Sequence, residues 1–260
     1  MIGAGNVAWH LSKAFENAGH GIAEVYSRNR QHANSLTERL YDATPVNHLN
    51  LSKSSAELFL LTIPDDAYRE VVQHLILPEN AILAHTSGSH SLSILQGPTH
   101  LQGNFRTGVF YPLQSFNKGV PVEVEEIPLC IEASDRATEV ALTNIARDIS
   151  QTVYLVTSEE RRVLHIAAVL ASNFTNHLWA LTKDLVDKNA LEFDLLKPLI
   201  RETLRKALDA PHPALVQTGP AIRKDQEVIR NHLSYLQSDP RVHKVYEILS
   251  ESICQGKNKK

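Results

Sequence analysis

The sequence predicts an α/β fold, with a parallel, doubly wound sheet in the first part of the chain and an all-helical domain in the second. Three observations support this prediction. A glycine-rich loop at residues 3–8 comes directly before an amphipathic helical pattern. Short apolar strand patterns then alternate with helical patterns up to residue 156. From Thr157 onward only helical patterns remain, so we expect one domain over residues 1–156 and a second over 157–260.

The elements of the first domain follow one another in a regular order. Val7, Leu11 and Phe15 recur at helical spacing and predict a helix after the glycine loop, and a short polar helix is expected near residues 30–40. Asp66 is placed to cap a helix that runs through Leu75. Short apolar runs predict strands at residues 22–26, 58–63, 81–85, 109–111, 127–131 and 153–156. This alternation of strands and helices implies a parallel sheet.

One expected strand is missing from this order. A phosphate-binding glycine loop normally follows a strand of the sheet, but only Met1 and Ile2 precede Gly3. Loss of a central strand would leave the edges of its two neighbours unpaired. Either the numbered chain starts late relative to the natural protein, or the first strand is a stub.

The second domain is expected to open with one long helix. Residues 157–160, Thr-Ser-Glu-Glu, have the form of a capping box. A helix can run from Ser158 to about Lys188, which is longer than most helices of globular proteins. Its apolar stripe consists of Leu164, Ala168, Ala171, Phe174, Leu178, Leu181 and Leu185. Such a helix is expected to pack against more than one neighbour.

Composition excludes several classes of function. The formal net charge of the 260-residue chain is −3 and its basic residues are scattered, which argues against a nucleic-acid surface. The chain has no uninterrupted apolar stretch of about 18 residues, so no transmembrane helix is expected. Cys130 and Cys254 have neither metal-ligand nor redox spacing, and no histidine cluster has metal-ligand spacing. We therefore expect no metal and a reducing, cytoplasmic location.

The glycine loop has the pattern of a dinucleotide-binding site. Gly3 allows a tight turn, Gly5 allows the backbone to approach a pyrophosphate, and the small Ala8 allows the helix to pack closely on the strand. The phosphates would lie at the positive end of the following helix. We therefore expect Gly3, Gly5, Asn6 and Val7 to hold the pyrophosphate.

The residues that follow the second strand favour NADP over NAD. An NAD-preferring site usually has an acidic residue there, which binds the adenosine ribose hydroxyls. Ser27 and Arg28 occupy that place instead, and a hydroxyl and a guanidinium suit a 2′-phosphate. The alternative is that Arg28 is a surface arginine that stacks on the adenine.

Several motifs together resemble a known family. They occur in the order GAGNVA at residues 3–8, HTSGS at 85–89, YPLQSF at 111–116, SNFTNH at 172–177 and TGPAIR at 218–223. This pattern resembles a bacterial family of Rossmann-like proteins with a C-terminal domain of unknown function, often named NADP oxidoreductases. More distantly, the chain is similar to pyrroline-5-carboxylate reductase, ketopantoate reductase, and the 6-phosphogluconate and 3-hydroxyisobutyrate dehydrogenases. The resemblance implies an N-terminal NADP-binding domain and a helical C-terminal domain that forms a homodimer.

Polar residues follow two of the predicted buried strands. Ligands of doubly wound sheets bind at the carboxyl ends of the strands. By resemblance to the reductases, the residues at these two ends line the ribose and nicotinamide of the cofactor: Ile63, Pro64 and Asp65, and Thr86, Ser87 and Gly88. The alternatives are an ordinary polar turn at residues 85–88 and a helix cap in the first segment.

The long helix carries polar residues that are candidates for catalysis. At 100° per residue, His165, Ser172 and Asn176 fall on one face, with Asn173 beside them. Related hydroxyacid dehydrogenases carry a catalytic lysine and asparagine on this helix, and here His165 takes roughly the place of the lysine. A histidine can transfer a proton near neutral pH, while Asn173 and Asn176 could position a substrate that Ser172 also contacts. The alternative is a buried hydrogen-bond network that braces the helix.

One further candidate lies between two later helices. Arg223 follows the helix-breaking pair Gly219 and Pro220, and it could bind a carboxylate or phosphate of the substrate. It could equally tie the loop to a neighbouring helix or a second subunit. Asp225 can cap the helix that comes next.

The leading hypothesis is an NADP-dependent oxidoreductase that transfers hydride to or from a small C=O or C=N substrate. His165 would be its acid or base, and Asn173 and Asn176 would position the substrate. A reduced deazaflavin is a less favoured redox partner. The alternative class is a non-catalytic NADP-binding dimer with a regulatory or sensor role, which the missing lysine favours.

Overall fold

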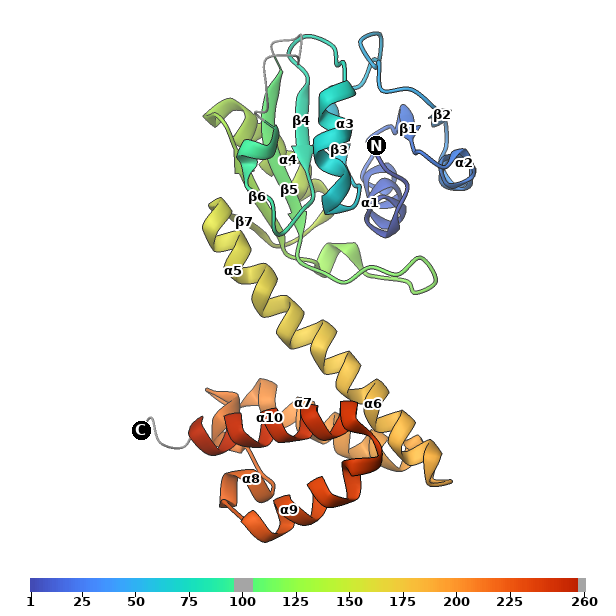
Figure 1. Ribbon diagram of the computed structural model, residues 1–260. Helices are drawn as coiled ribbons and strands as arrows, with labels where there is room; N and C mark the ends of the chain where they lie inside the picture. The colour runs from blue at the N-terminus through green and yellow to red at the C-terminus, as the bar shows by residue number, and fades with distance from the viewer. Residues whose placement is uncertain (96–104, 257–260) are drawn as a thin grey trace. The chain divides into compact units, whose positions relative to one another are not determined.

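The computed structural model describes residues 1–95 and 105–256, which form two compact units, Met1–Phe174 and Thr175–Lys260 (Figure 1). The change to helical pattern expected after residue 156 occurs there, since Thr157 caps a helix that starts at Ser158. The units nevertheless divide later, inside that helix. The physical reason is that its first turns pack on the sheet: Leu164 lies against Val109 and Cys130 of two strands.

The first unit is built on a largely parallel sheet, and all six predicted strands are present. One sheet has the order β3 (Leu58–Leu61), β4 (Ile82–His85), β5 (Arg106–Pro112), β6 (Leu129–Ala133) and β7 (Val153–Leu155). Beside it, β1 (Glu24–Tyr26) pairs in parallel with β2 (Thr44–Val46), a strand that the sequence patterns did not predict. The Rossmann-like α/β class expected from the sequence is confirmed.

Ile2 stands where the first strand of this order is expected. Ile2 forms parallel bridges to both Tyr26 of β1 and Leu61 of β3, so it joins the two sets of strands at the centre of the sheet. Because the bridges involve a single residue, the amino ends of β1 and β3 are not paired with each other. A cavity of about 680 Å³ lies there, lined among others by Met1, Glu24 and Leu58.

The sheet departs from a fully parallel arrangement at one place. β6 is antiparallel to β5, whereas β3, β4 and β5 are parallel to one another and β7 is parallel to β6. A parallel neighbour requires a crossover connection, usually a helix. The segment between β5 and β6 contains only the short 3₁₀ helix Val124–Glu126, so the chain returns in the opposite direction.

Helices cover both faces of the sheet. On one face, α1 (Asn6–Asn17) and α4 (Arg136–Ile149) contribute Leu11 and Leu142 to a buried cluster that includes Phe110 of β5. On the other face, α3 (Tyr68–His74) packs on Leu83 of β4. A shorter helix, α2 (Arg30–Thr37), contacts β1 and β2. The predicted cap at Asp66 is wrong, because Asp66 lies within the 3₁₀ turn Asp65–Ala67 and the N-cap position of α3 is Ala67, which provides no side-chain cap.

The long predicted helix is present, with an interruption of its geometry. It consists of α5 (Ser158–Ala168), a π-helical segment (Val169–Phe174) and α6 (Thr175–Lys188). The predicted capping box is confirmed, since Thr157 and Glu160 exchange both of its hydrogen bonds. The π segment was not predicted. Residues in an i→i+5 helix turn through a smaller angle than in an α-helix, so a face calculated at 100° per residue does not continue through it.

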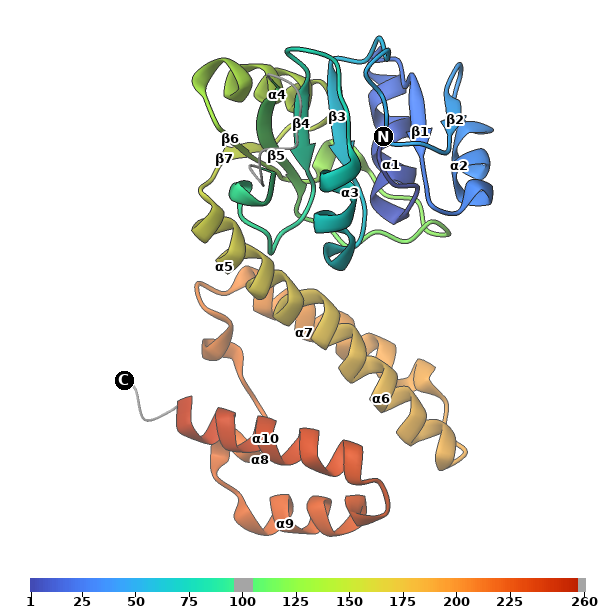
Figure 2. The ribbon, with the colours of Figure 1, turned by 45° about the horizontal axis from the view of Figure 1, so that its top comes forward.

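The described part of the second unit contains α6 and four further helices: α7 (Lys197–Asp209), α8 (Pro220–Arg223), α9 (Gln226–Tyr235) and α10 (Pro240–Gly256). Short 3₁₀ helices occupy Phe193–Leu196, Pro213–Val216 and Leu236–Ser238. As Figure 2 shows, α10 lies beside α8 and α9. Asp225 accepts a hydrogen bond from Val228 N and caps α9, as predicted. Within the described ranges, no helix is long and apolar enough to cross a membrane.

Candidate active site

The glycine loop has the close backbone packing that its sequence predicts. Gly3 has φ +115°, and a Cβ at this position would lie 2.4 Å from the carbonyl oxygen of Thr62. Thr62 Oγ1 in turn donates to the carbonyl oxygens of Ile2 (3.2 Å) and Gly3 (3.1 Å). The positive φ and the lack of space both require glycine at residue 3.

The start of α1 suits an anionic ligand. Gly5 is the N-cap of α1 and provides no side-chain cap, and the first turn has no acidic residue. Gly5 and Asn6 are exposed, whereas Ala8 is fully buried in a cluster with Val25 of β1. The N–H groups of the first turn of a helix have no partner within it and lie at its positive end. These residues therefore fit the pyrophosphate of a dinucleotide.

Lys118 lies beside this loop and was not predicted from the sequence. Its Nζ donates to the carbonyl oxygen of Ala4 at 2.9 Å and lies 5.0 Å from the ring centroid of Trp9. Two neighbours hold the same segment on α1: the ring of Phe116 stacks on His10, and His10 Nε2 lies 3.0 Å from the carbonyl oxygen of Asn117. The segment has no sequence motif for phosphate binding, so the position of the Lys118 ammonium beside the glycine loop is seen only in the folded chain.

The predicted 2′-phosphate residues lie next to the glycine loop. Ser27 and Arg28 directly follow Tyr26, whose carbonyl oxygen accepts the N–H of Gly3 at 2.8 Å. Ser27 is half-buried and Arg28 is exposed. Asn29 caps α2 by accepting a hydrogen bond from Gln31 N. A hydroxyl and a guanidinium are thus available at the end of β1.

Two other strand ends meet at the same edge of the sheet. Thr86 donates both its backbone N–H (3.2 Å) and its Oγ1 (3.0 Å) to the carbonyl oxygen of Leu61. Ser89 Oγ donates to the carboxylate of Asp65, and His90 Nε2 lies 2.9 Å from the carbonyl oxygen of Asp65. The segment Ile63, Pro64 and Asp65 is therefore adjacent to the segment Thr86, Ser87 and Gly88, at the carboxyl ends of β3 and β4.

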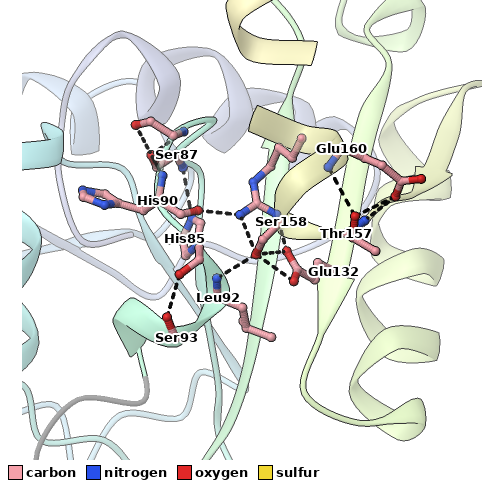
Figure 3. Close-up of polar contacts among 12 residues, drawn as sticks. His85, Ser87, His90, Leu92, Ser93, Glu132, Thr157, Ser158 and Glu160 are labelled. Carbon is pink, nitrogen blue, oxygen red and sulfur yellow. Dashed lines mark hydrogen bonds and ion pairs between the residues drawn. The ribbon is translucent and has the colours of Figure 1, made fainter. Parts of the chain in front are cut away.

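Hydrogen bonds within the second of these segments shape it into a tight loop. Ser87 Oγ accepts the N–H groups of Ser89 and His90, both at 3.1 Å, and Ser87 N donates to Nδ1 of His85 at 3.2 Å (Figure 3). Burial lowers the pKa of His85 to about 3, and the charge of Arg161 acts in the same direction. His85 is therefore neutral at physiological pH and supports the loop.

His165 is brought to this loop by α5. Its Nδ1 lies 3.1 Å from the hydroxyl of Tyr111 on β5. A Cβ at Gly88 would lie 2.5 Å from the same Nδ1 and 2.6 Å from Cγ of the ring. The imidazole therefore packs directly on the backbone at Gly88. The structure thus joins two predicted site residues that are far apart in the sequence, and it adds Tyr111, which lies in the YPLQSF motif without an assigned role.

A buried ion pair anchors α5 one turn before His165. The guanidinium of Arg161 is fully buried, pairs with the carboxylate of Glu132 on β6, and donates to the carbonyl oxygen of His90. Ser158 Oγ lies 2.9 Å from both carboxylate oxygens of Glu132, and Leu92 N donates to Ser158 Oγ at 3.1 Å (Figure 3). These contacts connect α5, β6 and residues 90–92. No local pattern predicts a pair of residues so far apart.

The remaining predicted site residues lie elsewhere along the helices. Ser172 and Asn173 are exposed in the π segment, so the calculated face with His165 does not extend to them. Asn176 is exposed in α6 and Arg223 is exposed at the end of α8, and both belong to the second unit. Their roles stay predictions. Among the described residues, no group of three or more His, Cys, Asp or Glu could hold a metal ion.

Two family models match the chain. A Rossmann-like domain matches residues 1–110, and the Domain of unknown function (DUF2520) matches residues 127–253. None of the proteins with curated functions matches.

Solved structures resemble the chain over nearly its whole length. A protein from Bacteroides fragilis, provisionally named an NADP oxidoreductase, is 41% identical, with 98% of this chain and 96% of that chain covered and a TM-score of 0.88. The reductive aminase from Aspergillus terreus, solved with NADPH and ethyl-5-oxohexanoate, is 13% identical (98% and 92% covered, TM-score 0.69). A pyrroline-5-carboxylate reductase from Coxiella burnetii is also 13% identical (97% and 96%, 0.55).

The last two similarities show a shared fold only, because identity is low. The identity of 41% to the Bacteroides protein, over almost all of both chains, goes further. Together with the two matching family models, it shows that this chain belongs to the family in which a Rossmann-like domain is followed by the domain of unknown function DUF2520.

Proposed function

We propose that this protein is an NADP-dependent oxidoreductase that transfers hydride to or from a small C=O or C=N substrate. The observation that carries the proposal is the position of His165, whose ring packs on Gly88 at the sheet edge where the glycine loop also lies. A group able to transfer a proton thus lies at the same carboxyl-end edge of the sheet as the loop that suits a dinucleotide. The name of the Bacteroides relative and the NADPH bound to the Aspergillus reductive aminase support the choice of cofactor.

The cofactor residues are assigned by their place along the sheet edge. Gly3, Gly5, Asn6 and Val7 would hold the pyrophosphate, Ser27 and Arg28 the 2′-phosphate, and Ile63, Pro64, Asp65, Thr86, Ser87 and Gly88 the ribose and nicotinamide. When bound, NADPH supplies the hydride. The protein contributes the orientation of the nicotinamide and the proton that accompanies the hydride.

The substrate side of the site includes residues of the helices. His165 would exchange a proton with the substrate oxygen or nitrogen. We extend the proposal to Asn173 and Asn176, which would position the substrate, and to Ser172 and Arg223 as further substrate contacts. Their exposed amide, hydroxyl and guanidinium groups suit a ligand of this class.

Exposed apolar side chains support a homodimer formed through the helical unit. Leu195, Leu199 and Leu208 are 71%, 63% and 76% exposed, respectively. Large apolar side chains this exposed are candidates for burial in an interface. Light scattering coupled to size-exclusion chromatography tests it, and a monomer at micromolar concentration would contradict it. The two cysteines are free, which favours a reducing, cytoplasmic location.

Cofactor titration is the first test of the proposed function. We expect wild-type protein to bind NADP more tightly than NAD. Arg28→Ala should raise the Kd for NADP about 10- to 100-fold and leave the Kd for NAD nearly unchanged, because hydrogen bonds to a charged group contribute about 1.5–3 kcal/mol. Arg136→Ala is a matched control, since Arg136 is an exposed arginine of α4 that pairs with Glu139. An equal loss for both cofactors would contradict the phosphate role, and absence of binding would refute the proposal.

Turnover is the second test. NADPH oxidation is followed with ketones and cyclic imines as substrates. His165→Ala should abolish turnover and leave NADP affinity intact, because the imidazole packs on Gly88 and has no contact with the glycine loop at residues 3–5. A variant with unchanged turnover would remove His165 from the reaction. A protein that binds NADP and reduces no substrate would favour the regulatory alternative, which the absence of the related enzymes' lysine also favours.

A further inference from the structure

Tyr111 is buried directly behind His165. Its side chain extends from β5 into a cluster with Cys130 and Leu164, and only 7% of the residue is exposed. The phenol oxygen lies 3.1 Å from Nδ1 of His165, and the two rings meet edge to face with centroids 6.0 Å apart. Among the described residues, Nδ1 is the one hydrogen-bond partner of this hydroxyl. Donation from the phenol O–H to Nδ1 is the arrangement that gives this buried hydroxyl its partner in the neutral pair.

This hydrogen bond decides which nitrogen of His165 carries a proton. A neutral imidazole has one N–H and one acceptor nitrogen. Because Nδ1 accepts from Tyr111, the N–H is on Nε2. The imidazole is half-buried and the phenol is almost completely enclosed. His165 is thus more open to a substrate than Tyr111 is.

A neutral imidazole alone is a poor proton donor, since loss of its N–H would leave an imidazolate. We propose that Tyr111 supplies the proton of the reduction and acts through His165. This inference rests on the proposed function. It assigns Tyr111 as a positioning residue that sets the tautomer of His165 and transfers a proton to Nδ1 of its ring during the reaction.

The step is balanced in atoms and charge. The carbon of C=O receives the hydride that bound NADPH would supply, and the π electron pair moves to the oxygen. That oxygen takes the proton from Nε2 of His165, while Nδ1 takes the proton from the phenol of Tyr111. The products are an alcohol, NADP⁺, a neutral imidazole with its proton on Nδ1, and a phenolate. A solvent proton taken up at Nε2 then restores the phenol by the reverse transfer.

The surroundings of Tyr111 agree with this role. Burial raises the pKa of Tyr111 to about 12, and the neighbouring Cys130 adds to this, so the phenol is protonated before the reaction. A phenol of this acidity still protonates the far more basic alkoxide that hydride transfer would leave. The buried guanidinium of Arg161 acts in the opposite direction and stabilises the phenolate.

The experiment compares Tyr111→Phe with wild type in two measurements. Phenylalanine keeps the ring and its packing and removes only the hydroxyl. The first measurement is ¹⁵N NMR of histidine-labelled protein without cofactor, at a pH at which the imidazole is neutral, with His165 assigned from its absence in His165→Asn. The second is the rate of NADPH-dependent reduction of ethyl 5-oxohexanoate. Tyr154→Phe is the matched control, because Tyr154 is a 57% exposed tyrosine of β7.

In wild type we expect the Nε2–H tautomer of His165 with a hydrogen-bonded Nδ1. Tyr111→Phe should lose the Nδ1 signature and reduce kcat at least about 100-fold, with an unchanged KM for NADPH, since proton transfer contributes about 10²–10⁴-fold. Tyr154→Phe should match wild type. Identical His165 spectra in Tyr111→Phe and wild type would overturn the inference, and so would undiminished turnover. A wild-type protein that binds no NADPH would refute the proposed function instead, while the spectra would still decide whether Tyr111 sets the tautomer of His165.

Discussion

The contact between Gly88 and His165 makes a substitution at Gly88 a direct test of the site. In Gly88→Ala, the new Cβ would lie 2.5 Å from Nδ1, 2.6 Å from Cγ and 2.9 Å from Cβ of His165. Ordinary contacts between such atoms are about 3.5–4.0 Å. Because Cβ and Cγ are close to the backbone of α5, the clash cannot be relieved by a swing of a flexible side-chain end. The ring must move by about 1 Å, which also strains its hydrogen bond to Tyr111.

A displacement of this size determines the expected losses in kcat and in folding free energy. Misplacement of a catalytic group by about 1 Å can lower a rate about 100-fold. Overpacking of a buried site costs about 1–3 kcal/mol of folding free energy. We therefore expect Gly88→Ala to remain folded and to lose about 100-fold in kcat for NADPH-dependent reduction. Steady-state kinetics and urea unfolding measure the two effects.

Gly21→Ala is the matched control, since no atom lies within 4 Å of the Cβ position at Gly21. That variant should retain wild-type turnover. The reasoning is refuted if Gly88→Ala turns over substrate at the wild-type rate with His165 still bonded to Tyr111. Equal losses in the two alanine variants would show that the effect is not specific to the contact with His165.

Three further predictions concern the surroundings of the site. Arg161→Met should lower the free energy of unfolding by about 3–5 kcal/mol in urea titrations, because it leaves the carboxylate of Glu132 without its buried partner; a loss below about 1 kcal/mol would contradict this. The pKa of His85 is about 3 in the folded chain and 6.5 for an unperturbed histidine, so the unfolded state binds the extra proton and stability decreases as pH falls from 6.5 towards 3. Between pH 7 and pH 4 the loss of unfolding free energy from His85 amounts to about 3 kcal/mol. In His85→Asn the side-chain oxygen can still accept a hydrogen bond from residue 87, so the variant should lose correspondingly less stability over this pH range. An identical pH dependence of stability in the variant and wild type would refute this prediction. Lys118→Met should raise the Kd for NADP about tenfold, because its ammonium lies beside the glycine loop and bonds of this charge-assisted type are strong, whereas Lys13→Met on α1 should have no effect; equal Kd values for the two variants would contradict a role for Lys118.

The first two turns of the long helix make two different sets of contacts within the first unit. Its first turn is tied to Glu132 and to residues 90–92, and its second turn presents His165 to Gly88. The helix then passes through the π segment before it enters the second unit at Thr175. Single-turn π segments occur frequently at functional sites. Here the segment separates the part of the helix that packs on the sheet from the part that belongs to the helical unit.

Much of the fold follows from local features of the sequence. Apolar runs of four to six residues predicted the strands at 58–63 and 81–85, because buried parallel strands are apolar on both faces. The glycine loop and its helix could be predicted because backbone crowding at Gly3 and Ala8 restricts these positions to small residues. The capping box at Thr157 is equally local. β2 was not predicted because its three residues, Thr-Pro-Val, are mostly exposed and contain no apolar run.

Two features of the candidate site could not be predicted from local sequence patterns. The face shared by His165 and Asn176 was calculated for a regular α-helix, and the π segment between them changes the rotation. A helical wheel assumes a regular α-helix and carries no information on packing, so it does not predict the π segment. Tyr111 and Glu132 were not candidates because each is one residue within a buried strand, and neither has a partner within reach along the chain.

By itself, the sequence determined the α/β class, the order of most elements, the glycine loop, and the residue types that favour NADP. These properties depend on spacing, on small residues at crowded backbone positions, and on charge at one strand end. Only the tertiary structure decided that Ile2 serves as a one-residue central strand, that β6 runs antiparallel to β5, and that Tyr111, His165 and Gly88 meet. The physical reason is that these features arise from contacts between separate elements: pairing between strands for Ile2 and β6, and the packing of α5 on the sheet for His165.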